Sequence, residues 1–261
     1  MLLTIDIGNT QIVFGVFDRH TLRSSWRLAT DHTKTADEYG IVFASLIRES
    51  GIPVQDIQGT IISSVVPPLT PTIESMVETF FHHSPLIVSS DFPFGLTLEY
   101  ANPQEIGTDR LVNAAAAFAC YRTNLIIVDF GTATTLCTVT KDGRYLGGAI
   151  APGVKSAADA LHSHTAKLPN VELARPKSVI GTDTTSSIQS GLMFGYAGLV
   201  DELVGRIEQE IGHSTKVVAT GGLAPILAPI SRTIQEIRPS LTLEGLELLY
   251  RCKTGQETPP Q

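Results

Sequence analysis

Hydrophobic and polar positions along the chain alternate between short apolar runs and segments with helical periodicity. Residues 2–7 and 11–17 are rich in β-favouring side chains, and Gly8-Asn9-Thr10 between them predicts two strands joined by a tight turn. Residues 37–51 repeat apolar side chains every three or four positions, which predicts a helix that stops at Gly51. Farther on, the pattern predicts a strand over 59–66, a helix over 72–81 and a short strand over 85–89.

The same order of elements begins again near the middle of the chain. Residues 125–130 and 134–140 predict two strands, and Asp142-Gly143 is a hairpin signal before 145–148. A long helix is predicted over 184–212, followed by a strand over 216–220 and a helix near residue 225. One face of the long helix is apolar, which fits either a protein core or a dimer contact: Ile188, Leu192, Tyr196, Leu199, Leu203 and Ile207.

Two stretches of the sequence resemble each other. "IDIGNT" and "VDFGTA" both place an aspartate at the end of an apolar strand, before a glycine turn, and Asp6 and Asp129 are 123 residues apart. A repeat at half the chain length predicts two α/β halves rather than a solenoid. We place the halves at residues 1–115 and 116–253, and we expect the polar, proline-rich residues 254–261 to be disordered.

Composition narrows the functional class. The net charge is −7 and no basic stripe is present, which argues against a nucleic-acid partner. Three widely spaced cysteines without a CxxC pair are typical of reduced thiols in a cytosol. No signal peptide is recognisable, and the longest apolar run, 114–120, is far shorter than the about 18 residues of a membrane helix. We therefore expect a cytoplasmic protein without a membrane partner.

The two Asp–Gly turns are the strongest chemical signal. Amide groups in such turns can hold phosphate oxygens, but Asp6 and Asp129 would repel a phosphate unless a cation lay between them. A hydrated Mg²⁺ carried with a nucleotide fits, because Mg²⁺ keeps waters and needs only one or two carboxylates. Either aspartate alone could simply cap its turn, whereas their paired occurrence favours the nucleotide site.

Two further stretches carry candidate chemistry. In "EIGTDRLVNAAAAFACY", Asp109 and Arg110 lie at the first turn of an alanine-rich helix. An ionised carboxylate there could accept a hydroxyl proton while the guanidinium holds an anion, although helix capping explains such a stretch equally simply. In "ATGGLAP", residues 219–225, the glycine pair allows a ligand to approach the backbone closely, or merely makes a tight connection.

Other patterns are set aside. Gly148-x4-Gly153 is followed by Val154, so the phosphate-loop pattern GxxxxGK[ST] misses by one residue. His82-His83 and the pair at 162 and 164 lack partners at zinc-site spacing, and we interpret them as surface residues.

With these stretches in place, the chain resembles the type III pantothenate kinase family of the acetate and sugar kinase, Hsc70 and actin superfamily. The resemblance runs from residue 1 to about residue 250. It is carried by "DIGNT" (6–10), "GTDR" (107–110), "DFGTATT" (129–135), "GGAIAPG" (147–153), "GTDTTSSIQSG" (181–191) and "ATGGLA" (219–224).

The resemblance implies a fold and a set of site residues. The fold would be α/β, with two duplicated ribonuclease-H-like (actin-like ATPase) domains that have mixed central sheets and flanking helices. Asp109 would be the catalytic base, Asp129 would bind a monovalent cation, K⁺ or NH₄⁺, and Asp6 would face the Mg²⁺ through water. ATP would contact Asp6, Ile7, Gly8, Asn9, Thr10, Gln11, Ile12, Val13 and Thr132. Pantothenate would contact Tyr100, Gly107, Thr108, Asp109, Arg110 and Thr184.

The resemblance also implies a function: ATP-dependent phosphorylation of pantothenate to 4′-phosphopantothenate, the first step of coenzyme A biosynthesis, by a homodimer. Two alternatives stay open at this point. One is a catalytically silent relative that acts as a regulator, and the other is a superfamily kinase or phosphatase with a different substrate. The complete GTDR and DFGT stretches argue against the regulator.

Overall fold

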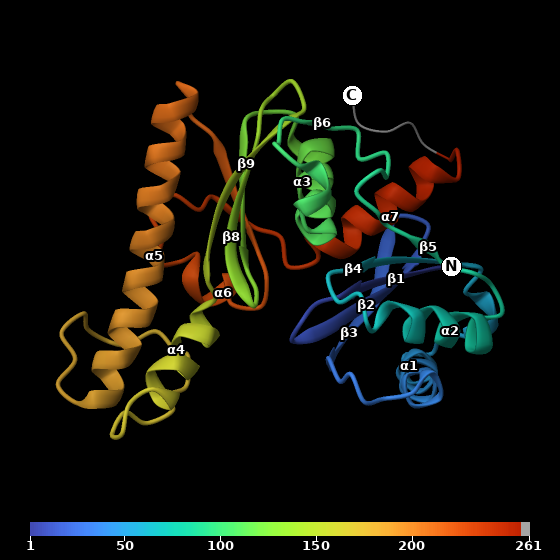
Figure 1. The fold of residues 1–261 in the computed structure, drawn as a ribbon, viewed down its shortest axis with the longest axis horizontal. Coiled ribbons are helices and arrows are strands. Elements are labelled where there is room, and N and C mark those ends of the chain that lie inside the picture. The colour runs from blue at the N-terminus through green and yellow to red at the C-terminus, as the bar shows by residue number, and fades with distance from the viewer. Residues whose placement is uncertain (257–261) are drawn as a thin grey trace. The chain divides into compact units, whose positions relative to one another are not determined.

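The computed structural model describes residues 1–256, which form two compact units (Figure 1). Of the described residues, the first unit comprises Met1–Leu96, Ala101–Ala116 and Leu241–Gln256. The second comprises Thr97–Tyr100 and Ala117–Ser240. Helix α3 (Thr108–Tyr121) begins in the first unit and ends in the second.

The first unit is built on a five-stranded mixed sheet in the order β3-β2-β1-β4-β5. Three strands, β1 (Leu2–Ile7), β2 (Gln11–Asp18) and β3 (Thr21–Ala29), form an antiparallel meander. β4 (Gly59–Ser64) and β5 (Leu86–Ile87) continue the sheet in parallel with β1. The sheet therefore has one antiparallel and one parallel half.

Helices cover both faces of this sheet. α1 (Ala36–Glu49) and α2 (Thr70–Phe81) share one apolar core with the inward residues of β1 and β2, where the rings of Phe14 and Phe43 stack 3.8 Å apart. α7 (Leu241–Lys253) lies on the other face. Its Leu243 packs against Gly15 of β2 and its Tyr250 against Gly59 of β4, where added β-carbons would lie 3.0 Å and 2.1 Å from these side chains. Burial of apolar side chains on both faces holds the unit together.

The second unit contains a six-stranded mixed sheet in the order β11-β10-β7-β8-β9-β6. β7 (Leu125–Phe130), β8 (Ala133–Val139) and β9 (Arg144–Pro152) form an antiparallel meander. β10 (Lys216–Thr220) and β11 (Glu236–Ile237) are parallel to β7, and the short β6 (Thr97–Leu98) pairs with β9.

The long helix α5 (Thr184–Ile211) packs on this sheet together with α4 (Val154–Ser163) and the short α6 (Ala224–Leu227). Every residue of the predicted apolar stripe on α5 contacts this core, so the stripe faces the protein interior. The most deeply buried positions of the helix lie next to the stripe, each one residue after a stripe position: Met193, Ala197, Val200 and Val204.

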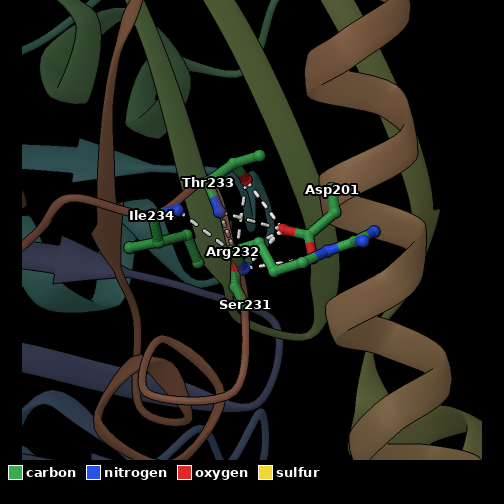
Figure 2. Close-up of polar contacts among 5 residues, drawn as sticks. All are labelled: Asp201, Ser231, Arg232, Thr233 and Ile234. Atoms are coloured by element: carbon green, nitrogen blue, oxygen red, sulfur yellow. Dashed lines mark hydrogen bonds and ion pairs between the residues drawn. The ribbon is translucent and has the colours of Figure 1, made fainter.

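Asp201 fixes α5 to the segment that follows α6 (Figure 2). Its carboxylate accepts hydrogen bonds from the hydroxyls of Ser231 (2.6 Å) and Thr233 (2.9 Å) and from the backbone N–H groups of Arg232 and Thr233. Burial raises the pKa of Asp201, but these hydrogen bonds outweigh it and hold the pKa below its usual value.

The two sheets repeat one strand order. In each unit a three-stranded meander is extended by two strands parallel to its first strand. The first strands, β1 and β7, also share one pattern of burial, in which only the aspartate at the fifth position is partly exposed. The expected fold class, two α/β units with mixed sheets and flanking helices, is confirmed.

The predicted elements agree with the structure to within about two residues at most ends. The predicted strand 59–66 is shorter, because β4 ends at Ser64. Five strands and helices were not expected: β3, β6, β11, α4 and α7. The halves 1–115 and 116–253 remain a prediction about duplication, whereas packing places α7 with the first unit. Of the predicted tail, residues 257–261 lie outside the described residues. Within residues 1–256, no helix combines the length and the apolar character needed to span a membrane.

Candidate active site

Asp6 stands at the end of β1, immediately before an exposed turn of the first unit. The turn is closed by a hydrogen bond from the Gly8 N–H to the Gln11 carbonyl (3.0 Å). Thr30 holds it from the side, because its hydroxyl donates to the Gly8 carbonyl (2.6 Å) and its N–H to the Thr10 carbonyl (3.0 Å). Residues 9–11 of this fixed turn are exposed, as a phosphate-binding turn requires.

The strand next to Asp6 leads directly to the start of α3. Ser63 on β4 is the register partner of Asp6, and its hydroxyl lies 3.0 Å from the hydroxyl of Thr108. The Thr108 hydroxyl also donates to the Ser64 carbonyl (3.2 Å). The end of β4 is thus joined to the first residue of α3, which precedes Asp109.

Asp109 lies in the first turn of α3 and is half-buried. Its Oδ1 accepts a hydrogen bond from the Arg110 N–H (2.8 Å). A β-carbon at Gly107 would stand 2.5 Å from the same oxygen, so the carboxylate folds back against Gly107, and any other residue there would require the carboxylate to move. Arg110 beside it is buried, with 8% exposure.

Burial raises the pKa of Asp109, and this effect exceeds the opposing effects of the Arg110 N–H and guanidinium. A carboxyl group with a raised pKa is a better proton acceptor once it is ionised. A general base next to an arginine that can hold an anion is therefore chemically consistent with this arrangement.

Asp129 holds the corresponding place in the second unit. Its neighbours across the sheet are Thr135 on β8 and Thr220 on β10. Gly221, with φ of +88°, follows Thr220, and a β-carbon there would lie 2.5 Å from the Asp129 Oδ1. Gly221, the first glycine of "ATGG", thus brings its backbone against this carboxylate.

Thr132 lies in the turn after β7, and the start of α4 supports it. The Ser156 hydroxyl donates to the Thr132 carbonyl (3.1 Å), and a β-carbon at Gly153 would collide with that carbonyl at 2.2 Å. Gly153, the second glycine of the rejected phosphate-loop pattern, therefore has a packing role. It lets α4 begin directly against the turn.

The two remaining predicted substrate residues lie apart within the second unit. Tyr100 packs over Gly147 of β9, where a β-carbon would be 3.1 Å from its ring. Thr184 is exposed at the start of α5 and lines a hollow of about 750 Å³ together with Leu161, Leu168 and Gly181. Tyr100 is not part of that lining.

The remaining predicted positions divide between the units. Asp6–Val13 and Gly107–Arg110 belong to the first, and Asp129 and Thr132 to the second. Sequence reasoning missed Ser63, Thr30 and Gly221 as neighbours of these positions, because pairing between distant segments creates the contacts.

The aspartates of the site suit a hydrated divalent ion better than a metal site built entirely from protein ligands. Among residues 1–256, no three His, Cys, Asp or Glu side chains gather where they could hold a metal ion. Mg²⁺ does not need such a group, because it usually takes one or two carboxylates and completes its shell with water and phosphate. Asp6 beside its exposed turn is chemically suited to that role.

Solved structures share this fold at low sequence identity. A putative Baf family transcriptional activator from Campylobacter jejuni has a TM-score of 0.60 and is 19% identical, covering 97% of this chain and 99% of its own. An inorganic polyphosphate/ATP-glucomannokinase from Arthrobacter sp. strain KM has a TM-score of 0.51 and is 14% identical, covering 97% and 98%. The chain therefore shares its fold, two α/β units with mixed sheets, with these two proteins. At these identities the likeness shows the fold alone, and the name of the Campylobacter jejuni protein assigns no function to this chain.

Sequence comparison identifies the family. The family model "Type III pantothenate kinase" matches residues 2–206. A type III pantothenate kinase from Anaeromyxobacter sp. (strain Fw109-5) is 50% identical over 250 residues, and one from Geobacter sulfurreducens is 48% identical over 250; each match covers 96% of this chain and 98% of the relative. The chain belongs to the type III pantothenate kinase family, which confirms the family and the enzyme class expected from its motifs.

Proposed function

We propose that the protein transfers the γ-phosphoryl group of ATP to the primary hydroxyl of pantothenate, giving 4′-phosphopantothenate for coenzyme A biosynthesis. The observation that carries this proposal is the identity of about half of all residues, over nearly the whole chain, with relatives named for this activity. The raised pKa and fixed position of Asp109 support it, because they provide the base that an alcohol acceptor requires.

Separate groups of residues would bind ATP and pantothenate. The turn at Asp6–Val13, with Thr132, would bind the phosphates of ATP, and Asp6 would face the divalent ion through water. That ion would offset the charge of the phosphates. Gly107–Arg110, Tyr100 and Thr184 would bind pantothenate.

At the acceptor, Asp109 would orient the hydroxyl and take its proton late, as the oxygen bonds to the γ-phosphorus and ADP leaves. Phosphoryl transfer depends mainly on positioning and charge neutralisation, which suits a site without a covalent nucleophile.

The monovalent cation is part of the proposal. We assign K⁺ or NH₄⁺ to Asp129, where the register places threonines on both neighbouring strands. A cation beside this carboxylate would offset phosphate charge in a chain that lacks a phosphate-loop lysine.

We also propose a cytoplasmic homodimer. Large apolar side chains are exposed near the hollow at the start of α5: Leu161 is 38% exposed, Val179 64% and Ile180 80%. Leu161 lines the hollow, and the other two immediately precede Gly181 in its wall. A second copy of the chain would cover this apolar surface.

The reaction is tested by following ADP release with pantothenate as the acceptor, in K⁺ and then in Na⁺. We expect turnover that requires pantothenate, falls in Na⁺, and drops by about 10²–10⁴-fold in Asp109→Asn. Asp91→Asn, a change of the same chemistry at an exposed site, serves as the matched control. ATP binding without pantothenate-dependent turnover would contradict the proposal and direct attention to acetate, sugars or polyphosphate as substrates.

A further inference from the structure

The hydroxyl groups of Ser63 and Thr108 form a hydrogen bond between residues 45 positions apart in the sequence. Ser63 is fully buried on β4. Because the single hydroxyl hydrogen of Thr108 is directed to the Ser64 carbonyl, the Ser63 hydroxyl must donate to the Thr108 oxygen. The two bonds therefore run in one fixed order, from Ser63 to Thr108 to the backbone of β4.

This pair of bonds controls the orientation of a short rigid turn. The Gly107 carbonyl accepts hydrogen bonds from the N–H groups of Arg110 (3.1 Å) and Leu111 (3.3 Å), so residues 107–111 move together. Thr108 is the first helical residue and Asp109 follows it. A rotation of this turn would move the Asp109 carboxylate by a comparable distance.

Ser63 also lies beside Asp6. The two are paired in register across the parallel strands β1 and β4. One buried side chain therefore links the strand end that carries Asp6 to the helix start that carries Asp109, and both ends lie in the first unit.

We propose that Ser63 is a positioning residue for phosphoryl transfer: through Thr108 it holds Asp109 in register with the strand end that carries Asp6. The proposal rests on the role of Asp109 proposed above. Ser63 itself does not touch the reacting groups. Its contribution is to the geometry of the base, where a misplacement of about 1 Å can cost about 100-fold in rate.

The competing explanation is that two buried hydroxyls merely satisfy each other. The same strand provides a matched example of that situation. Thr60, also on β4 and buried, bonds through its hydroxyl to the His83 Nε2 (2.8 Å), away from both aspartates. Thr60→Val removes a buried hydroxyl of comparable setting without touching the start of α3.

The test compares Ser63→Ala with Thr60→Val in the full-length enzyme. We expect Ser63→Ala to lower kcat by about 10-fold, with KM for ATP unchanged. The acid limb of its pH profile for kcat/KM should also shift, because a loosened turn changes the burial of Asp109. Thr60→Val should lose a similar amount of thermal stability and keep both kcat and the pH profile.

Further variants test whether Ser63 acts through Thr108 on Asp109. Thr108→Val should reproduce the kcat loss and pH shift, and should also raise KM for pantothenate, which Thr108 is proposed to contact. Ser63→Cys, which keeps the size of the side chain and weakens its hydrogen bond, decides the matter if Ser63→Ala does not fold. The double variant should be no worse than the more impaired single variant, because the two residues act as one unit. Equal kcat and pH profiles for Ser63→Ala and Thr60→Val would overturn the proposal. Asp109→Asn, measured in parallel, separates the two levels: if that variant keeps full activity, the role of Asp109 fails first.

Discussion

The carboxyl group of Asp109 occupies a setting that disfavours its charged form. Burial raises its pKa despite the neighbouring Arg110. The folded state therefore binds this proton more tightly than the unfolded chain does. The resulting stabilisation is fully present below the unfolded pKa and is lost as pH rises through the folded pKa. At neutral pH an ionised Asp109 thus lowers the free energy of unfolding.

From this follows a prediction for Asp109→Asn. The variant should lose about 10²–10⁴-fold in kcat and yet unfold at higher urea concentration than the wild type at about pH 8. The difference in stability should shrink as pH is lowered, because the wild-type carboxyl then takes up its proton. Urea titrations over a series of pH values measure it. A variant that is less stable than the wild type at about pH 8 would contradict this account of the site.

Residue by residue, the sequence predicts the chemistry better than the geometry. Asp6 and Asp129 stand where the strand-end pattern placed them, and Asp109 lies in the first turn of its helix as expected. The bond from Ser63 to Thr108 and the approach of Gly221 to Asp129 could not be predicted. Each depends on how a strand pairs with a distant segment, and local periodicity does not encode that pairing.

Among the elements, α5 and the segment after α6 depend on one buried acidic side chain. Asp201 accepts bonds from two hydroxyls and two backbone N–H groups (Figure 2). An amide in its place would direct N–H groups at some of these donors. Donors left without an acceptor in a buried setting are costly, at about 1–3 kcal/mol.

We therefore expect Asp201→Asn to lower the free energy of unfolding by about 1–3 kcal/mol at neutral pH. Because the pKa of Asp201 is lowered in the folded state, this stabilisation is present above the unfolded pKa and is lost as pH falls through the folded pKa. The difference in the free energy of unfolding between variant and wild type should narrow in acid, as the wild-type carboxyl takes up its proton. Glu202→Gln, the exposed neighbour in an i,i+4 ion pair with Arg206, should change stability little. Equal stability of Asp201→Asn and wild type in urea unfolding at neutral pH would refute the prediction.

Elements with a clear period were predicted well, and those with a mixed pattern were not. β1, β7 and β10 have the predicted bounds because each is a nearly continuous apolar run. α7 was missed because Gly245, a weak helix former, interrupts its leucines. That glycine is needed where α7 meets α3, since a β-carbon there would lie 2.6 Å from the Val112 carbonyl. Packing against α3, rather than helix propensity, therefore explains the glycine at position 245.

At the scale of the whole molecule, the exposed apolar residues of the second unit predict assembly. If a second copy covers Ile180, then Ile180→Asp should weaken the dimer by about 10-fold or more, because burying such a side chain contributes about 1.5–3 kcal/mol. Ile41, 60% exposed on α1 in the first unit, offers the matched control Ile41→Asp. Sedimentation over a range of concentrations measures the dimer dissociation constant.

Two outcomes would count against this assembly. A wild-type chain that sediments as a monomer throughout would exclude the dimer. Equal weakening by Ile180→Asp and Ile41→Asp would place the contact elsewhere.

The repeated architecture was also predictable at this scale, from the two Asp–Gly turns alone. What the repeat could not predict is the return of the chain to its first unit. The predicted repeat ends with the second sheet, so it does not predict α7. Its apolar side chains could be assigned to a unit only once the sheet they cover was known.

The position of α7 has a consequence for synthesis on the ribosome. Domains generally fold as units as they emerge, the N-terminal one first. Here the first unit to emerge lacks one covering helix until the whole second unit has been translated, because Leu241–Lys253 follows that unit in the chain. The second unit can therefore finish folding before the first has received its last helix. In this kinase the part of the protein that is made first is the part that is completed last.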